Sequence, residues 1–285
     1  MTEISASAGW RKLGLIAGGG DLPREIVRAM GAQPPFVIRI SGFAEDDFDD
    51  IDSVEHSVGE IGGIVKSLRS AGCDAVCFAG YISRPDIRTL RMDARGLKMV
   101  PRALAAGRKG DDAVLRVVVD EFERAGFRIV GPDSLLGPLS AEAGCLGAAP
   151  DDEAQEDADK AMAIAAEIGR LDIGQGAVVA RGVVLAVEAQ EGTNAMLERV
   201  ASLPQPLRGC PGARFGVLAK RPKPIQERRV DMPTIGVDTV QLCAAAGLAG
   251  IALEAGGALI VDREGVIRAL EEAGLFLQIR PAGRA

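Results

Sequence analysis

Residues 13–40 read LGLIAGGGDLPREIVRAMGAQPPFVIRI and contain the pattern that decides the fold. An apolar run over 13–17 leads into a glycine-rich loop, an amphipathic segment follows over 22–30, and a second apolar run covers 35–40. Short apolar runs of this length are typical of buried strands, and the segment between them has helical spacing. The stretch therefore predicts a βαβ unit at the start of a parallel sheet.

The same alternation continues to residue 142. A helix is expected over 59–72, a strand over 74–80, a long helical region over about 97–125 and a strand within 127–137. We therefore expect an α/β chain whose N-terminal domain, residues 11–142, is a Rossmann-like doubly wound parallel sheet. Residues 143–157 are small, acidic and rich in turn formers, so they predict a linker.

Residues 158–285 have a different pattern. Two pairs of short apolar runs, 177–189 around Arg181 and Gly182 and 250–262 around residues 255–257, predict hairpins. Helices are expected before, between and after them. The second domain is therefore predicted to be α+β with a mixed sheet.

Composition limits the classes of function. The 285 residues carry a formal net charge of -7, which argues against a nucleic-acid-binding protein. His56 is the single histidine and lies in a stretch that predicts a surface connector, so a histidine-rich zinc site is excluded. No apolar run approaches the ~20 residues of a membrane span, and the first residues do not resemble a signal peptide, so a cytoplasmic protein is expected.

The glycine-rich loop is a candidate phosphate site. Gly18, Gly19, Gly20 and Asp21 follow a strand and open a helix, where backbone N–H groups and the helix dipole favour an anion. A tight turn that needs small residues is the alternative explanation of these glycines. The spacing is not that of a dinucleotide-binding loop, and no acidic residue ends the second strand, which weakens a nicotinamide-dependent oxidoreductase as a hypothesis.

Two further clusters could face a ligand. Ser83 follows the strand predicted over 74–80. Lys109, Asp111 and Asp112 precede an apolar helical run, where helix capping is the alternative role. In the second domain, the strand that ends in Glu188 is followed by a polar turn and a helix. The candidate substrate-binding residues of that region are Gln175, Gly176, Glu188, Gln190, Gly192 and Thr193.

Strand alternation would place Glu188 and Gln190 on one face of the sheet, with Thr193 capping the next helix. A helix-start signal is an alternative role for Thr193.

The stretch over 220–236, KRPKPIQERRVDMPTIG, combines five basic residues with two carboxylates and three prolines. Lys220 and Lys223 are expected to contact phosphate, and Asp231, just before Met232 and Pro233, could bind a metal or activate water. The alternative is a solvated basic loop with a proline turn.

Six motifs, in order, resemble one known family: IAGGGDLP, CFAGYISRPD, GRKGDD, RLDIGQGAVV, LAVEAQEGT and PKPIQERRVDMPTIG. This is the metal-dependent UDP-2,3-diacylglucosamine pyrophosphatase of lipid A biosynthesis, the type unrelated to calcineurin-like phosphoesterases. The resemblance extends from Lys12 to about Leu277. It implies hydrolysis of the substrate diphosphate to UMP and 2,3-diacylglucosamine 1-phosphate, with the lipid held between two domains.

The resemblance also implies Mg²⁺ as cofactor, with Mn²⁺ as a possible substitute, and Asp231 as the catalytic residue. Asp231 and Glu188 are the expected metal ligands, and Gln226 and Thr234 complete the substrate-binding set. Glu227 stands where the family often has aspartate. The expected partners are the lipid-linked UDP-sugar and the lipid product at the cytoplasmic face of the inner membrane, and the sequence does not indicate an oligomeric state.

Peripheral membrane contact is expected without a strongly basic amphipathic helix, through an exposed cavity mouth. The alternative function is a nonhydrolytic nucleotide or lipid-phosphate carrier.

Overall fold

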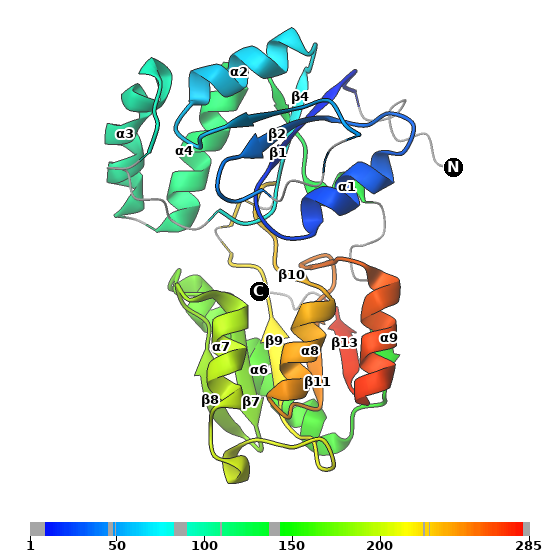
Figure 1. Ribbon diagram of the computed structural model, residues 1–285. Helices are drawn as coiled ribbons and strands as arrows, with labels where there is room; N and C mark the ends of the chain where they lie inside the picture. The colour runs from blue at the N-terminus through cyan, green and yellow to red at the C-terminus, as the bar shows by residue number, and fades with distance from the viewer. Residues whose placement is uncertain are drawn as a thin grey trace. The chain divides into compact units, whose positions relative to one another are not determined.

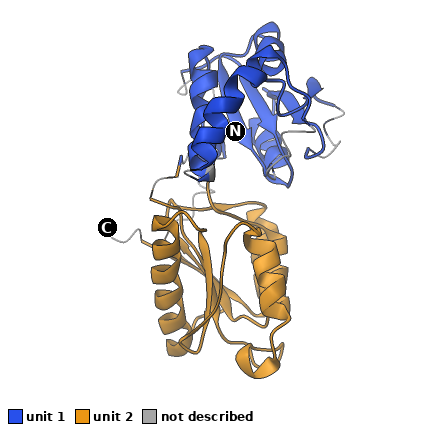
Figure 2. Ribbon diagram, turned by 90° about the vertical axis from the view of Figure 1, so that its left-hand side faces the viewer, with its two compact units in different colours: residues 1–137, 227–231 blue, residues 138–226, 232–285 orange. Residues whose placement is uncertain are grey.

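The chain folds into two compact units, which Figure 2 shows in separate colours. Unit 1 comprises residues 1–137 and 227–231, and unit 2 comprises residues 138–226 and 232–285. The computed structural model describes residues 9–44, 48, 50–82, 90–108, 110–136, 143–224, 226–227 and 229–281, without the side chain of Asp111.

Unit 1 is built on a parallel sheet of five strands in the order β3-β2-β1-β4-β5 (Figure 1). This confirms the parallel sheet that the sequence predicts. The strands are β1 (Leu13–Ala17), β2 (Phe36–Ile40), β3 (Ser53–His56), β4 (Ala75–Ala79) and β5 (Arg128–Ile129).

Helices cover both faces of this sheet. Along β1, Leu15 packs with Ile26 of α1 on one face, whereas Ile16 packs with Ile64 of α2 and Phe122 of α4 on the other. Successive strand residues point to opposite faces, so an uninterrupted apolar strand feeds both cores. The helices are α1 (Leu22–Met30), α2 (Ile61–Ser70), α3 (Ala94–Gly107), α4 (Asp111–Arg124) and the short α5 (Pro132–Leu135).

Strand β3 was not predicted. It pairs in parallel with β2 at the edge of the sheet, where the sequence analysis expected a surface connector. Its residues SVEH do not form an apolar run. An edge strand has a neighbouring strand on one side only and is less buried than a central strand, so it needs fewer apolar residues. His56 ends this strand, and its Nε2 lies 2.9 Å from the hydroxyl oxygen of Ser67 on α2. The histidine therefore joins β3 to α2.

Unit 2 contains a mixed six-stranded sheet in the order β6-β13-β11-β9-β7-β8, as predicted for its class. Strands β9, β11 and β13 are parallel to one another, and β6, β7 and β8 run antiparallel to their neighbours. The strands are β6 (Gly144–Gly147), β7 (Gly176–Ala180), β8 (Val183–Val187), β9 (Val217–Lys220), β11 (Gly250–Glu254) and β13 (Phe276–Arg280); β10 (Thr234–Ile235) and β12 (Leu259–Ile260) form a separate parallel pair.

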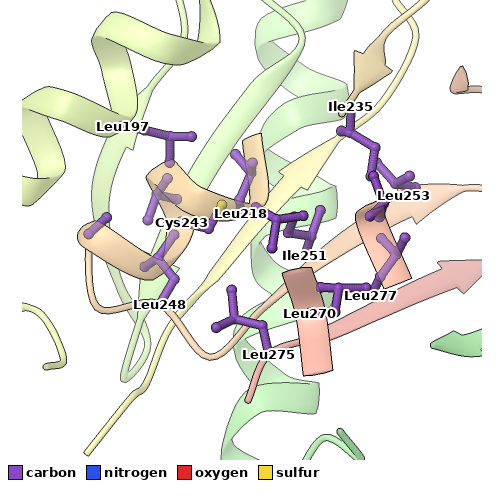
Figure 3. Packing of buried hydrophobic residues seen from close by; sticks show 14 of the residues in the cluster. Leu197, Leu218, Ile235, Cys243, Leu248, Ile251, Leu253, Leu270, Leu275 and Leu277 are labelled. Carbon is purple, nitrogen blue, oxygen red and sulfur yellow. The ribbon is translucent and has the colours of Figure 1, made fainter. Parts of the chain in front are cut away.

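The helices of unit 2 are α6 (Asp152–Arg170), α7 (Gly192–Ala201), α8 (Val237–Ala245) and α9 (Arg263–Ala273), with a 3₁₀ turn over Gln205–Leu207. Alanines of α6 pack on one face of the sheet. The other three helices form the larger core on the opposite face, where Leu218, Ile251 and Leu277 of the strands meet helix side chains (Figure 3).

The stretch predicted as a linker, 143–157, is folded within unit 2. Strand β6 pairs with β13, and α6 starts at Asp152 with the Asp151 side chain accepting the amide hydrogen of Ala154 (2.8 Å). Small residues here reflect close packing, because a Cβ on Gly147 would lie 2.3 Å from the Leu275 carbonyl oxygen. Local composition cannot distinguish this cause from linker flexibility.

One of the two predicted hairpins is present. Strands β7 and β8 pair antiparallel around Arg181 and Gly182, as expected. The stretch over 250–262 is not a hairpin, because β11 lies between β9 and β13 while β12 pairs with β10. In the part of the chain that the structure describes, no helix combines the length and apolar character that a bilayer crossing requires.

The β7–β8 turn depends on a buried carboxylate. Asp157 of α6 accepts the amide hydrogens of Arg181 (2.8 Å) and Gly182 (2.7 Å) and is 1% exposed. We predict that Asp157→Ala lowers the free energy of unfolding by about 3 kcal/mol, because two hydrogen bonds to a charged acceptor are lost. Urea denaturation measures the change. The exposed neighbour Glu156 supplies the control, Glu156→Ala, and equal midpoints for the two variants would contradict the prediction.

Candidate functional site

The stretch over 220–236 does not form one basic loop. Residues up to Gln226 belong to unit 2, residues 227–231 belong to unit 1, and the chain is again part of unit 2 from Met232. Arg228 lies outside the described residues. The basic side chains expected to act together are thus divided between units.

Residues 227–231 are anchored to helix α4. The side chain of Asp112 accepts the amide hydrogen of Glu227 at 2.7 Å. The carbonyl of Glu227 in turn accepts from the amides of Val230 (2.9 Å) and Asp231 (3.0 Å), which closes a single helical turn. Val230 packs on the same core as α4. We call residues 227–231 the Asp231 turn.

An arginine fastens this turn a second time. Arg229 donates to both carboxylate oxygens of Glu227, each at 2.9 Å, and to Glu123 of α4 at 2.7 Å. The hydrogen bonds from Arg229 hold the pKa of Glu227 below its usual value, and those to Glu227 raise the pKa of Arg229. Both oxygens of Glu227 are engaged, so this carboxylate holds Arg229 in place.

Asp231 lies at a pocket within unit 1. The pocket has a volume of about 270 Å³, near the lower end of the range for small-molecule sites. Of the described residues that line it, Asp231 carries the single carboxylate, and most of the others are apolar. They come from the end of β1, from β4 and the residues after it, from α4 and from the Asp231 turn: Ile16, Phe78, Ala79, Gly80, Tyr81, Ile82, Leu115, Val118, Val119, Val230 and Asp231.

The remaining described bases of the stretch have partners within unit 2. Lys220 is buried and donates to the carbonyl of Thr234 (3.0 Å), and Lys223 donates to Asp172 (2.7 Å). Nε of Arg221 lies 2.5 Å from a carboxylate oxygen of Glu254. Phosphate contact by Lys220 and Lys223 remains a prediction, and it requires these cations to exchange or share their present partners.

The glycine-rich loop has a structural explanation. The amide of Gly18 donates to the Ala79 carbonyl (2.8 Å) and that of Gly19 to the Tyr81 carbonyl (2.9 Å). A Cβ on Gly18 would lie 2.5 Å from the Tyr81 oxygen, which explains the need for glycine there. These two N–H groups are therefore already bonded, although the sequence analysis assigned them to phosphate.

In unit 2, Glu188 directly follows β8 and is a buried carboxylate that is 6% exposed. One of its oxygens accepts from the Thr193 hydroxyl (3.0 Å), and the other, Oε2, is buried without a hydrogen-bond partner. A Cβ on Gly176 would lie 2.5 Å from this oxygen, so the glycine makes room for the carboxylate. Close by in sequence, Gln175 accepts from the amide of the buried Gln226 (3.2 Å).

Two expectations about this region were wrong. Gln190 is exposed in the turn after β8, whereas Glu188 is buried, because strand alternation stops at Val187. Thr193 does not cap α7, which begins at Gly192 after Glu191. Its hydroxyl instead donates to Glu188.

The other predicted residues are scattered. Ser83 and Lys109 lie outside the described residues, and Asp111 is the first residue of α4. Asp21 precedes α1 without a side-chain cap bond, and the Thr234 hydroxyl donates to the carbonyl of Met232 (3.1 Å). Asp112, for which the sequence left a ligand-facing role and helix capping open, instead accepts the amide hydrogen of Glu227.

A divalent cation fits these residues in part. No group of three or more His, Cys, Asp or Glu side chains suited to a metal occurs among the described residues. Mg²⁺ is commonly held by one or two protein carboxylates together with water and substrate oxygens. The buried Oε2 of Glu188, which has no hydrogen-bond partner, is a carboxylate oxygen of this kind.

Comparison with known proteins identifies the family. Models of the LpxI N-terminal and C-terminal domains match residues 12–139 and 142–278. The UDP-2,3-diacylglucosamine pyrophosphatase LpxI of Caulobacter vibrioides is 56% identical over 270 residues, which are 94% of this chain and 96% of that protein. The chain belongs to the LpxI family. The resemblance that the six motifs indicate is thereby confirmed.

The anchoring of the Asp231 turn can be tested directly. We predict that Asp112→Ala increases hydrogen exchange of the peptide over 226–232 by roughly tenfold, because the Glu227 amide loses a charged acceptor. Mass spectrometry after deuterium labelling measures it, and Asp112→Asn, which keeps an acceptor oxygen, should change less. Asp120→Ala, on the same helix but in exposed ion pairs with Arg102 and Arg124, is the control. Unchanged exchange in Asp112→Ala would overturn the assignment.

Proposed function

We propose that this protein hydrolyses the diphosphate of UDP-2,3-diacylglucosamine in lipid A biosynthesis. The observation that carries the proposal is the 56% identity, across 94% of the chain, to a relative with that activity. In the reaction, a water oxygen bonds to one phosphorus and the bridging P–O bond breaks. The products are UMP and 2,3-diacylglucosamine 1-phosphate.

Asp231 is the proposed catalytic residue. Its carboxylate lines a mostly apolar pocket, and its backbone is held by the anchored turn. A carboxylate in this place can accept a proton from the attacking water or bind a cation that neutralises the diphosphate. Apolar walls strengthen either interaction because they lower the local dielectric.

Mg²⁺ is the proposed cofactor, with Mn²⁺ as a substitute. When bound, it supplies positive charge to the phosphate oxygens. Asp231 and Glu188 are the proposed carboxylate ligands, and the unpartnered oxygen of Glu188 supports this assignment. Thr193 orients Glu188 through its other carboxylate oxygen.

Unit 1 is also proposed to be Rossmann-like, because its strand order matches the first five strands of that fold. In its glycine-rich loop, however, two backbone amides already donate hydrogen bonds to backbone carbonyls. This does not support dinucleotide binding. The proposed location is the cytoplasmic face of the inner membrane, where a lipid-linked UDP-sugar would be met.

We expect Asp231→Ala to bind UDP-2,3-diacylglucosamine and to release UMP at least a thousandfold more slowly than the unchanged protein. Measuring UMP by chromatography in a detergent-dispersed assay tests this, with Asp238→Ala, an exposed aspartate on α8, as the control. Full activity in Asp231→Ala would refute the role. If the unchanged protein binds the substrate but never releases UMP, the nonhydrolytic carrier is the better description.

Metal dependence gives a separate test. EDTA is expected to abolish UMP release, and added Mg²⁺ or Mn²⁺ to restore it. In Glu188→Gln the Mg²⁺ concentration for half-maximal rate should rise about tenfold, because a neutral amide binds a hard cation less well than a carboxylate. Thr193→Val, which removes only the hydroxyl, should shift it less. An unchanged Mg²⁺ requirement in Glu188→Gln would remove Glu188 from the metal site.

A further inference from the structure

Helix α3 presents an exposed face that is both apolar and basic. Leu97 is 64% and Leu104 is 53% exposed, which is unusual for leucine in a folded helix. Pro101 and Arg108 follow at spacings of one turn, so one stripe runs along the helix, with Lys98 beside it. We call Leu97, Lys98, Pro101, Leu104 and Arg108 the α3 outer face.

The opposite side of α3 fixes this orientation. Gly96 and Met99 are buried, and a Cβ on Gly96 would lie 1.9 Å from the Gly59 carbonyl oxygen. The helix packs against α2 and α4, and Figure 1 shows it at the outside of unit 1. Only glycine, which has no Cβ, lets α3 lie this close to the Gly59 carbonyl. This contact fixes the inward side of the helix and leaves its leucines on the outer side.

The charge of this segment is opposite to that of the chain. Residues 91–108 contain five basic residues and one acid, whereas the whole chain has a net charge of -7. The acid, Asp93, faces inward and accepts the amide hydrogens of Gly63 (2.8 Å), Arg95 (3.0 Å) and Gly96 (2.8 Å). The α3 outer face therefore combines leucines with positive charge and carries no acidic residue.

Some of the bases remain available. Arg91 pairs with Glu60 (3.3 Å) and Arg95 with Glu121 (2.7 Å). Lys98 and Arg108 are exposed and form no ion pair with any residue that the structure describes. These two are the bases that flank the leucine stripe.

We propose that the α3 outer face binds the surface of an anionic lipid bilayer. Leucines that enter the headgroup region next to lysine and arginine are the features of a helix that lies in the membrane interface. Each base near an anionic surface strengthens binding about fivefold. The sequence analysis expected no such helix, because α3 has its apolar residues on two sides and so lacks a simple amphipathic pattern.

This inference rests on the proposed function in one respect, which is that a diacylated substrate has to be taken from a membrane. The choice of the α3 outer face itself rests on the exposure of its leucines and on its positive charge. Two other exposed leucines make the contrast clear. Leu171 lies beside Arg170, which pairs with Glu167, and Leu207 lies beside Arg208, which donates to the Leu203 carbonyl. The base next to each of these leucines is therefore already hydrogen-bonded.

Vesicle sedimentation of the full chain without substrate tests the proposal. The unchanged protein should sediment with vesicles of phosphatidylglycerol and phosphatidylethanolamine and bind phosphatidylcholine vesicles at least tenfold more weakly. Leu97→Ser with Leu104→Ser should reduce binding to the anionic vesicles roughly tenfold. Lys98→Glu with Arg108→Glu should reduce it at least about 25-fold, and salt at about 1 M should weaken binding of the unchanged protein.

Leu171→Ser with Leu207→Ser is the matched control and should bind like the unchanged protein. Circular dichroism and sedimentation velocity establish that each variant is folded and report its oligomeric state. The proposal is overturned if the unchanged protein ignores anionic vesicles, if the control loses as much binding as the α3 variants, or if the α3 leucine variant converts a dimer into monomers, since the face would then join two copies of the chain.

Activity measurements separate this proposal from the proposed function. The α3 leucine variant should release UMP at an unchanged rate from substrate in detergent micelles, but several-fold more slowly from substrate embedded in anionic vesicles. If the unchanged protein releases no UMP from either form yet binds vesicles through α3, the proposed function fails and the membrane surface stands. Equal rates on vesicles for both proteins would count against the surface.

Discussion

The hydrogen bond from the Glu227 amide to the Asp112 side chain is the interaction on which the candidate site depends. It joins residues that are 115 positions apart and attaches the Asp231 turn to α4. A hydrogen bond to a charged group contributes about 1.5–3 kcal/mol, and Arg229 adds bonds to Glu123 and Glu227. The pocket wall that contains Val230 and Asp231 exists because these bonds offset the entropy of ordering the turn.

Carboxylates outside the stretch over 220–236 pair with several of its basic side chains. Lys223 pairs with Asp172, Arg221 with Glu254 and Arg229 with Glu123. A count of local charges therefore overestimates the positive potential available to a ligand. A diphosphate that binds to these cations has to compete with the carboxylates already in contact with them.

The sequence predicts the strongly periodic parts of the fold. Strands β1 and β4 are continuous apolar runs, and β2 is apolar except for Arg39. Each is found as expected, because a strand buried on both faces is rich in apolar residues. Strand β3 was missed because an edge strand needs no apolar run, and β6 was missed because its glycines have the composition of a linker. The arrangement of β11 and β12 depends on long-range pairing that no local pattern encodes.

The sequence singles out Asp231 as a candidate, but it does not reveal the residues that hold the Asp231 turn in place. Motif resemblance identifies Asp231, since the aspartate stands in a long ordered match. The bond between Asp112 and the turn could not be predicted in this way. Its partner is the backbone amide of Glu227, and every residue except proline has such an amide. For two glycines the sequence suggested a role in ligand binding, whereas the structure gives them a role in packing. Gly18 and Gly176 stand out in the sequence, yet the structure uses them to admit a carbonyl and a carboxylate respectively.

The two family models divide the chain between residues 139 and 142, and they assign Asp231 to the C-terminal part. The Asp231 turn nevertheless belongs to unit 1, so unit 1 is encoded by two separate stretches of the gene. A fragment that ends near residue 139 would lack Val230 from its core and the aspartate from its pocket. The halves of this protein are consequently not interchangeable modules, and any recombination that swaps one of them must bring a matching α4 and Asp231 turn together.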